Sequence, residues 1–289
     1  MIEYCRIGTA ELASVVEHRL PLALRDLVPD FSPAAISDFL PELAPRFLDP
    51  KGWTAELVFR SWVVRTRHHT ILVDTCIGND KPRPGSRFHL TRTDYLDRLA
   101  AAGVAPEAVD FVFCTHLHID HCGWNTRLAD GRWIPTFPNA RYVFSRAELH
   151  HWATLPEAER GIHHGVYEDS VLPVIAAGHA EIVEAGYRVD DEVAVEPSPG
   201  HTPGHYCVTL SQAGATAIFT GDVTHHPVQM AVPEWNSGFC GDPARAIATR
   251  RAILENAAER GTLVVPAHFT SPGLGRVERR GAGFAFITA

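Results

Sequence analysis

One short stretch constrains the fold of this chain more than any other, because it carries three imidazoles and one carboxylate. It reads His116-x-His118-x-Asp120-His121. It follows residues 109–114, an apolar run rich in β-branched and aromatic side chains that predicts a buried strand. The cluster therefore lies where a strand ends and a loop or helix begins, which is where open α/β sheets place their ligand sites.

The spacing within this cluster suits metal binding. Neutral imidazole and carboxylate are the usual ligands of zinc and similar ions. His116 and His118 are two apart, so on an extended segment both side chains point to one side. Asp120 and His121 are adjacent, so we expect them to diverge, with one pair binding one ion and the other pair a second. The alternative is a polar loop with hydrogen-bonded histidines, which suits a lone histidine better than this cluster.

Further ligand types appear downstream, and two metal ions need them, since a zinc ion takes about four ligands. His201 follows the apolar residues 193–195 within the phrase Pro-Gly-His-Thr-Pro-Gly-His. Asp222 follows the apolar run 217–220, and His268 follows residues 263–266. Each position alone is weak evidence, but the ordered series predicts one shared metal centre.

The series resembles the metallo-β-lactamase-fold hydrolases from about Glu56 onward. Within that family the sequence looks most like the lactonase and methyl-parathion-hydrolase branch, including the phrase at residues 199–205. The resemblance implies an α+β protein with a four-layer αββα sandwich. It implies two divalent ions, zinc by default, with iron, manganese or cobalt fitting the same ligands. One ion would be held by His116, His118 and His201, the other by Asp120, His121 and His268, with Asp222 bridging them.

Asp74 ends an apolar strand, and the resemblance assigns the equivalent acid to the orientation of a metal-ligating histidine. The alternative is a turn residue that caps residues 75–78. We expect Asp74 to contact a histidine of the metal set.

The expected chemistry is hydrolysis. Two ions about 3.5–4 Å apart hold a bridging hydroxide that attacks a carbonyl or phosphoryl centre. Asp120 orients the hydroxide and passes its proton to the leaving group, so it is the expected catalytic residue. We therefore predict a hydrolase that opens a small lactone or ester, with a phosphotriester as a further substrate. An acyl thioesterase using the same site, and a non-hydrolytic metal-binding or redox module of the same fold, remain alternatives.

Other branches of the family fit less well. The main class of zinc β-lactamases has a cysteine at the place of Asp222, and the flavodiiron reductases have an acid at the place of His118. Nucleases of the fold carry basic clefts, whereas this chain has a formal net charge of -8. That charge argues against nucleic-acid and anionic-membrane partners and favours a small-molecule substrate.

The substrate-binding residues are less clearly marked. His225 and His226 follow Asp222 and either hydrogen-bond a substrate carbonyl or cap the loop. Trp124 and Trp235 either line an aromatic pocket or belong to the core. Lactonases of the fold use a tyrosine in this region to polarise the carbonyl, but no tyrosine lies between Asp222 and His268.

The remaining features bound the class of protein. The six cysteines form no C-x-x-C pair, and no signal peptide or membrane-spanning run is visible, which together favour a cytoplasmic protein. We predict one domain over residues 1–289, with residues 1–55 as an N-terminal extension that covers the core, lines the pocket or forms a homodimer contact. Strands are expected at residues 2–7, in three hairpins (57–65 with 70–74, 206–210 with 215–220, 276–279 with 284–288) and at 141–144. Helices are expected to start at Ser32, Thr93, Ser145, Asp169 and Asp242, and residues 132–138 are expected to form an irregular loop.

Overall fold

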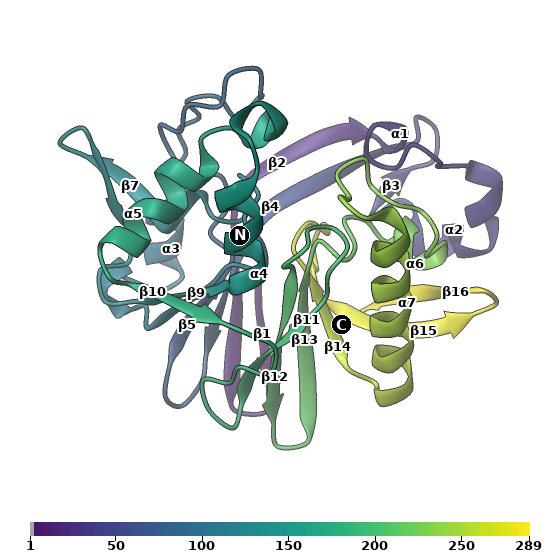
Figure 1. Cartoon of the computed structure of the whole chain (residues 1–289). Coiled ribbons are helices and arrows are strands. Elements are labelled where there is room, and N and C mark those ends of the chain that lie inside the picture. The colour runs from purple at the N-terminus through teal and green to yellow at the C-terminus, as the bar shows by residue number, and fades with distance from the viewer. Residues whose placement is uncertain (1–2) are drawn as a thin grey trace. The chain divides into compact units, whose positions relative to one another are not determined.

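The computed structural model describes residues 3–289, and the chain within it forms two compact units. Residues 3–18 and 59–187 make the first unit, and residues 19–58 and 188–289 make the second. Two of the three boundaries fall inside the long strands β2 (Ala10–Ala23) and β4 (Thr54–Arg65), which Figure 1 labels, and the third falls between Tyr187 and Arg188.

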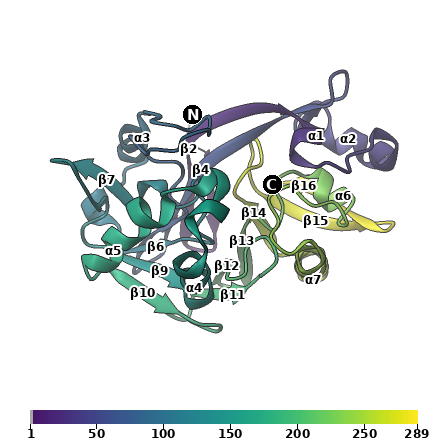
Figure 2. The same ribbon diagram turned by 45° about the horizontal axis from the view of Figure 1, so that its top comes forward.

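Mixed pairing characterises the larger sheet, which has the order β1-β2-β4-β5-β6-β9-β10, with β3 paired to β4. The four strands from β5 to β10 in this order run parallel, whereas β1 with β2, β3 with β4, and β4 with β5 are antiparallel. Parallel strands need crossover connections, which contain α3 between β5 and β6 and α4 and α5 between β9 and β10. In Figure 2, α4 lies beside β9, which it directly follows. The bounds are β1 (Glu3–Ile7), β3 (Leu48–Asp49), β5 (Thr70–Val73), β6 (Phe111–Phe113), β9 (Arg141–Ser145), β10 (Ala180–Val183), α3 (Tyr95–Ala101), α4 (Arg146–Thr154) and α5 (Leu172–Ala176).

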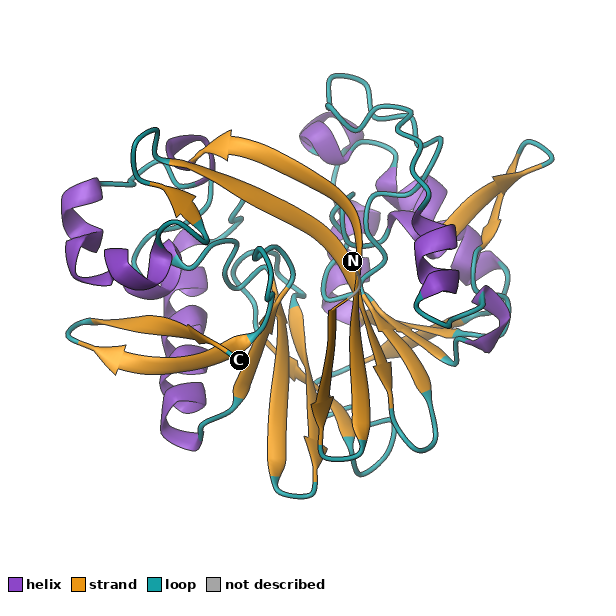
Figure 3. Cartoon of the chain, turned by 180° about the vertical axis from the view of Figure 1, so that it is seen from behind, coloured by secondary structure: helices purple, strands orange, loops and turns teal. Residues whose placement is uncertain are grey.

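The second unit is built on a six-stranded sheet in the order β11-β12-β13-β14-β15-β16. Only β13 and β14 are parallel, and α7 (Pro243–Arg260) connects them and packs against β15 (Figure 1). Asp242 caps this helix by accepting a hydrogen bond from the Arg245 amide at 3.0 Å, and Gly261 ends it in the left-handed conformation. Figure 3 marks the C-terminus at the end of the last hairpin. The strands are β11 (Val193–Pro197), β12 (Tyr206–Gln212), β13 (Ala215–Gly221), β14 (Leu263–Pro266), β15 (Gly275–Arg280) and β16 (Gly283–Thr288).

Most of the predicted N-terminal extension belongs to the second unit. It contains α1 (Leu24–Leu27), a 3-10 helix (Pro33–Phe39) and α2 (Leu40–Leu43). Phe47 packs its ring edge-on against Phe269 and Phe286, and all three are buried, which anchors the extension to the core of this unit.

Most predicted elements are confirmed, including the three hairpins and the helix that starts at Asp242. For the first strand this holds from Glu3, since residue 2 lies outside the described part of the chain. Two expectations are wrong. Ser32 makes no side-chain cap, and the helix after it is a 3-10 helix. Residues 132–135 form a strand, β8 (Arg132–Pro135), paired with β7 (Thr126–Ala129), because Asp130 and Gly131 both adopt positive φ in the tight turn between them.

None of the described helices is long and apolar enough to cross a membrane. The remaining helical segments are short. They are α6 (Val228–Ala231), the π-helix Tyr167–Val171 and the 3-10 turns Pro106–Ala108, Gly123–Asn125, Glu157–Glu159 and Gly161–His163.

Candidate metal centre

The loop after β6 gathers the predicted ligands of the first unit. His116 and His121 are almost fully buried, and their ring centroids are 4.1 Å apart. The ligand atoms of His116 and His118 lie within 4.8 Å of each other, as do those of Asp120 and His121. This segment therefore presents two pairs of side chains of a type that could hold a metal ion.

One detail of that prediction is wrong. The side chains of Asp120 and His121 do not diverge, because Asp120 Oδ2 lies 3.6 Å from His121 Nε2. The backbone here is a turn, with the His121 amide bonded to the His118 carbonyl at 3.1 Å, so the alternation of an extended strand does not apply.

Asp74 holds this loop in place from the end of β5. Its Oδ2 lies 2.9 Å from His121 Nδ1, and its Oδ1 accepts a hydrogen bond from the Thr115 amide at 2.8 Å. Asp74 is 3 % exposed, so water competes little for these bonds. A carboxylate on Nδ1 of a neutral imidazole leaves Nε2 as the metal-binding atom.

Glu17 on β2 is a second buried carboxylate that sequence reasoning missed. It accepts hydrogen bonds from the Ile77 amide and from Trp124 Nε1, both at 2.6 Å. Burial raises the pKa of Glu17, although its hydrogen bonds oppose the shift. Trp124, a predicted substrate residue, is thereby held inside the first unit, where its ring also stacks on Tyr95.

In the second unit, three imidazoles converge on the carboxylate of Asp222. His268 Nε2 lies 2.9 Å from Oδ1, whereas His201 Nε2 and His225 Nε2 lie 3.2 Å and 3.1 Å from Oδ2. All four side chains are buried. Three ring nitrogens aimed at one buried carboxylate are a donor set suited to a divalent cation.

His201 and His225 both lie beside Asp222, but their pKa values shift in opposite directions. Burial lowers the pKa of His201, but the adjacent Asp222 carboxylate outweighs it and raises the pKa to about 9. For His225 burial prevails, and the pKa falls to about 4. His225 is therefore a neutral imidazole at physiological pH.

Other hydrogen bonds orient this cluster. His268 Nδ1 lies 2.9 Å from the Val58 carbonyl, which turns its Nε2 toward Asp222. His205 Nε2 accepts a hydrogen bond from the Asp222 amide at 3.1 Å, and its Nδ1 contacts Ser198 Oγ at 2.7 Å. His205 thus supports the Asp222 backbone and is not itself a ligand.

Of the other predicted substrate residues, His226 and Trp235 are engaged elsewhere in the second unit, whereas His225 lies beside Asp222. Both ring nitrogens of His226 are engaged, with the Phe47 carbonyl at 2.9 Å and the Val228 amide at 3.2 Å. Trp235 is buried and packs edge-on against Phe31. His225 alone of the four lies among the predicted ligands, and its buried Nδ1 has no hydrogen-bond partner among residues 3–289. The sequence feature that could have predicted this position is that His225 lies three residues after Asp222.

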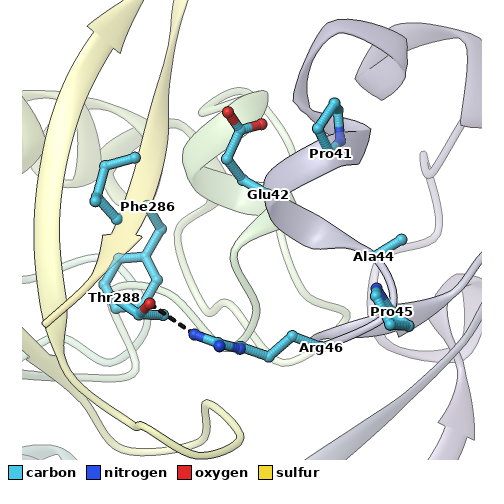
Figure 4. Close-up of a pocket in the computed structure, with 8 residues that line it drawn as sticks. Pro41, Glu42, Ala44, Pro45, Arg46, Phe286 and Thr288 are labelled. Carbon is cyan, nitrogen blue, oxygen red and sulfur yellow. Dashed lines mark hydrogen bonds between the residues drawn. The ribbon is translucent and has the colours of Figure 1, made fainter.

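A surface hollow of about 300 Å³ in the second unit lies between α2 and β16 and holds none of the predicted ligands (Figure 4). Arg46 Nη1 donates to Thr288 Oγ1 across it at 2.6 Å. The hollow is lined by Pro41, Glu42, Ala44, Pro45, Arg46, Phe286, Ile287 and Thr288.

Known proteins resemble this chain over most of its length. Residues 60–268 match the model of the metallo-beta-lactamase superfamily. An N-acyl homoserine lactonase of Bacillus thuringiensis is 23% identical over 221 residues, which cover 72% of this chain and 79% of the lactonase. The crystal structure of AbOPH, a hydrolase of the beta-lactamase superfamily, is 26% identical and superposes with a TM-score of 0.82 over 100% of this chain and 97% of its own. AidC, described as a dizinc quorum-quenching lactonase, is 21% identical with a TM-score of 0.79 over 100% of this chain and 97% of its own.

Proposed function

Because this chain belongs to the metallo-β-lactamase superfamily, as a hydrolase related to the N-acyl homoserine lactonases, we propose that it opens small lactones at a dinuclear zinc centre. The ligands of one ion are proposed to be His116, His118 and His201, and those of the other Asp120, His121 and His268, with Asp222 serving both. The observation that carries the proposal is the convergence of three buried imidazoles on Asp222. The loop after β6 adds further side chains of ligand type, those of His116, His118, Asp120 and His121.

The residues fit such a centre. Buried carboxylates and imidazoles are costly to leave without a countercharge or a full set of hydrogen bonds, and divalent ions offset that cost. Bound zinc ions supply a nucleophile at neutral pH, by lowering the pKa of water, and polarise a carbonyl oxygen. Iron, manganese and cobalt accept the same donors.

The protein side chains then divide the remaining work. Asp120 is the proposed catalytic residue. It is a carboxylate in the ligand loop, and 17% of its side chain is exposed, so it can pass a proton to the leaving oxygen. Asp74 is proposed to keep His121 in the tautomer that presents Nε2. His225, neutral and beside Asp222, is proposed to donate a hydrogen bond to the oxygen of the carbonyl under attack.

The substrate class rests on the relatives. The curated relative from B. thuringiensis is named as an N-acyl homoserine lactonase, and AidC was solved in complex with the product N-hexnoyl-L-homoserine. A lactone is therefore the first choice, with simple esters next, and phosphotriesters and acyl thioesters as further candidates. No tyrosine lies between Asp222 and His268, and His225 is the proposed hydrogen-bond donor there. This difference is expected to change which lactones the protein prefers as substrates.

The test combines metal analysis with a substrate panel. We expect two equivalents of metal and turnover of lactones above aryl esters, thioesters and phosphotriesters. His118→Ala and Asp120→Asn should abolish turnover. Bound metal without turnover on any member of the panel would favour the non-hydrolytic metal-binding module, and preferential thioester cleavage would favour the thioesterase.

Other features stay predictions of the sequence. We propose that residues 1–289 act as one functional domain, with residues 1–55 as an extension packed on it. We also propose that its partner is a small-molecule substrate and neither nucleic acid nor a membrane, that it forms a homodimer and that it is cytoplasmic.

A further inference from the structure

The ring of His118 lies in an aromatic environment supplied by a segment outside the metal motif. The His163 ring stacks on it, with centroids 3.9 Å apart and planes 11° from parallel. Trp152 meets the His118 ring nearly edge-on, at 6.0 Å and 87°, and meets His163 in the same way at 5.7 Å. All three residues belong to the first unit.

Hydrogen bonds tie the same residues to the backbone on both sides of His118. Glu148 Oε1 accepts from the Leu117 amide at 3.1 Å and from Trp152 Nε1 at 2.9 Å. The Ile119 amide donates to His163 Nδ1 at 3.4 Å, a long bond. Glu148 is 1 % exposed, so its link between the ligand loop and α4 is shielded from water.

The chain that carries His163 is held at both ends. Arg160 donates to the carbonyl of Trp152 at 3.4 Å and to that of Leu155 at 3.2 Å. On the other side, buried Asp169 binds Arg83 through two hydrogen bonds of 2.5 Å and 2.8 Å. The bidentate Arg83–Asp169 pair is geometrically restrictive and fixes one end of the segment, while Arg160 holds the other end.

We propose that His163 is a positioning residue for the metal ligand His118, acting as a stacked ring in a holder completed by Trp152 and Glu148. This proposal rests on the assignment of His118 as a ligand in the proposed function. A ligand ring already fixed in its plane loses less rotational freedom when it binds an ion. Stacked aromatic pairs of this kind correspond to about a two- to tenfold effect on an equilibrium constant, and we expect an effect of this size on metal affinity.

The test uses three variants of the full chain. His163→Ala removes the stacked ring, His163→Phe keeps a flat ring, and His164→Ala removes the neighbouring, part-exposed imidazole, whose contact is with Glu157. The readouts are zinc affinity, by competition with a chromophoric chelator, and the visible spectrum of the cobalt-substituted protein. We expect His163→Ala to weaken zinc binding about two- to tenfold and to alter the cobalt spectrum. His163→Phe should restore both, and His164→Ala should leave both unchanged.

The contrary results are distinct. Wild-type affinity and spectrum in His163→Ala, or failure of His163→Phe to restore them, would overturn the positioning role. The wild-type chain could bind metal more tightly than His163→Ala, as expected, and yet hydrolyse no substrate of the panel. The proposed function would then fail while this inference stands.

Discussion

At the scale of single residues, Asp222 organises the second unit's part of the site. One carboxylate receives the Nε2 atoms of His201, His225 and His268, and its own amide is held by His205. Two of these histidines are predicted ligands, whereas His225 was predicted only as a substrate contact. The difference between a ligand and a substrate donor can be measured.

His225→Phe should lower kcat for lactone hydrolysis by about 10²-fold, the usual cost of removing a hydrogen-bond donor to a developing oxyanion. Metal content should remain at the wild-type value, because His225 is not a proposed ligand. His226→Gln, at a histidine whose nitrogens are both engaged elsewhere, is the matched control and should retain activity. Loss of metal from His225→Phe would instead make His225 a ligand.

His226 also predicts a pH dependence of stability. Burial lowers its pKa to about 4 in the folded chain, while its bond to the Phe47 carbonyl opposes the shift. Its ordinary pKa is about 6.5, so below that value the unfolded state takes up a proton that the folded state does not. The stabilisation is thus present above pH 6.5 and is lost as the pH falls toward 4. Denaturant unfolding of wild type and His226→Gln should show their difference in unfolding free energy shrinking by roughly 1.4 kcal/mol per pH unit in this window. A constant difference would contradict the assignment.

At the scale of elements, close backbone contacts decide where the ligand loops can lie. A Cβ on Gly123 would lie 1.8 Å from the Ile77 carbonyl oxygen, and one on Gly200 would lie 2.3 Å from the Ala246 amide nitrogen. Gly200 directly precedes His201, and its φ of 138° is also strained for any other residue. These contacts press one ligand loop against the segment after β5 and another against the start of α7.

Gly123→Ala and Gly200→Ala should therefore each destabilise the protein by at least about 2 kcal/mol and reduce its metal content, because backbone must move to admit the methyl group. Thermal unfolding and elemental analysis measure both effects. Gly238→Ala is the control, since no atom lies within 4 Å of its added Cβ. Normal metal binding in both glycine variants would show that these contacts do not position the ligands.

At the scale of the whole molecule, metal binding at the proposed centre is expected to stabilise the folded chain. Ligand binding to the native state alone stabilises it, by about 4 kcal/mol at a thousand times the dissociation constant. Removal of metal by a chelator should lower the Tm by on the order of 5–10 °C, and added zinc should restore it. His118→Ala should start from the lower Tm and respond less to zinc. An unchanged Tm after verified metal removal would argue against a metal centre that contributes to stability.

Much of the fold was predictable, because its signals are local. The helix from Asp242 to Gly261 has a capping residue, a proline at its first position and a left-handed glycine at its end. Local signals failed where the polypeptide departs from the expected periodicity. The turn at Asp130 and Gly131 was overlooked, and the turn at His121 overrode the alternation expected of a strand.

The supporting residues of the site could not be predicted in the same way. Glu17 meets Trp124 across 107 positions of the chain, and Glu148 meets Leu117 across 31. No spacing rule connects such residues, because packing of separate elements creates their contacts. For the same reason Trp124, which the sequence offered as a pocket residue, is committed to Glu17 inside the first unit.

The sequence by itself determined the candidate metal ligands, their order and the family, because coordination chemistry limits which side chains can bind metal and the ends of strands place them in the fold. Only the tertiary structure decided which atom of each histidine is presented, since that depends on the partner of the other ring nitrogen. Asp74 makes this choice for His121 and the Val58 carbonyl makes it for His268. Both partners are distant in sequence, and folding alone brings them to the imidazole.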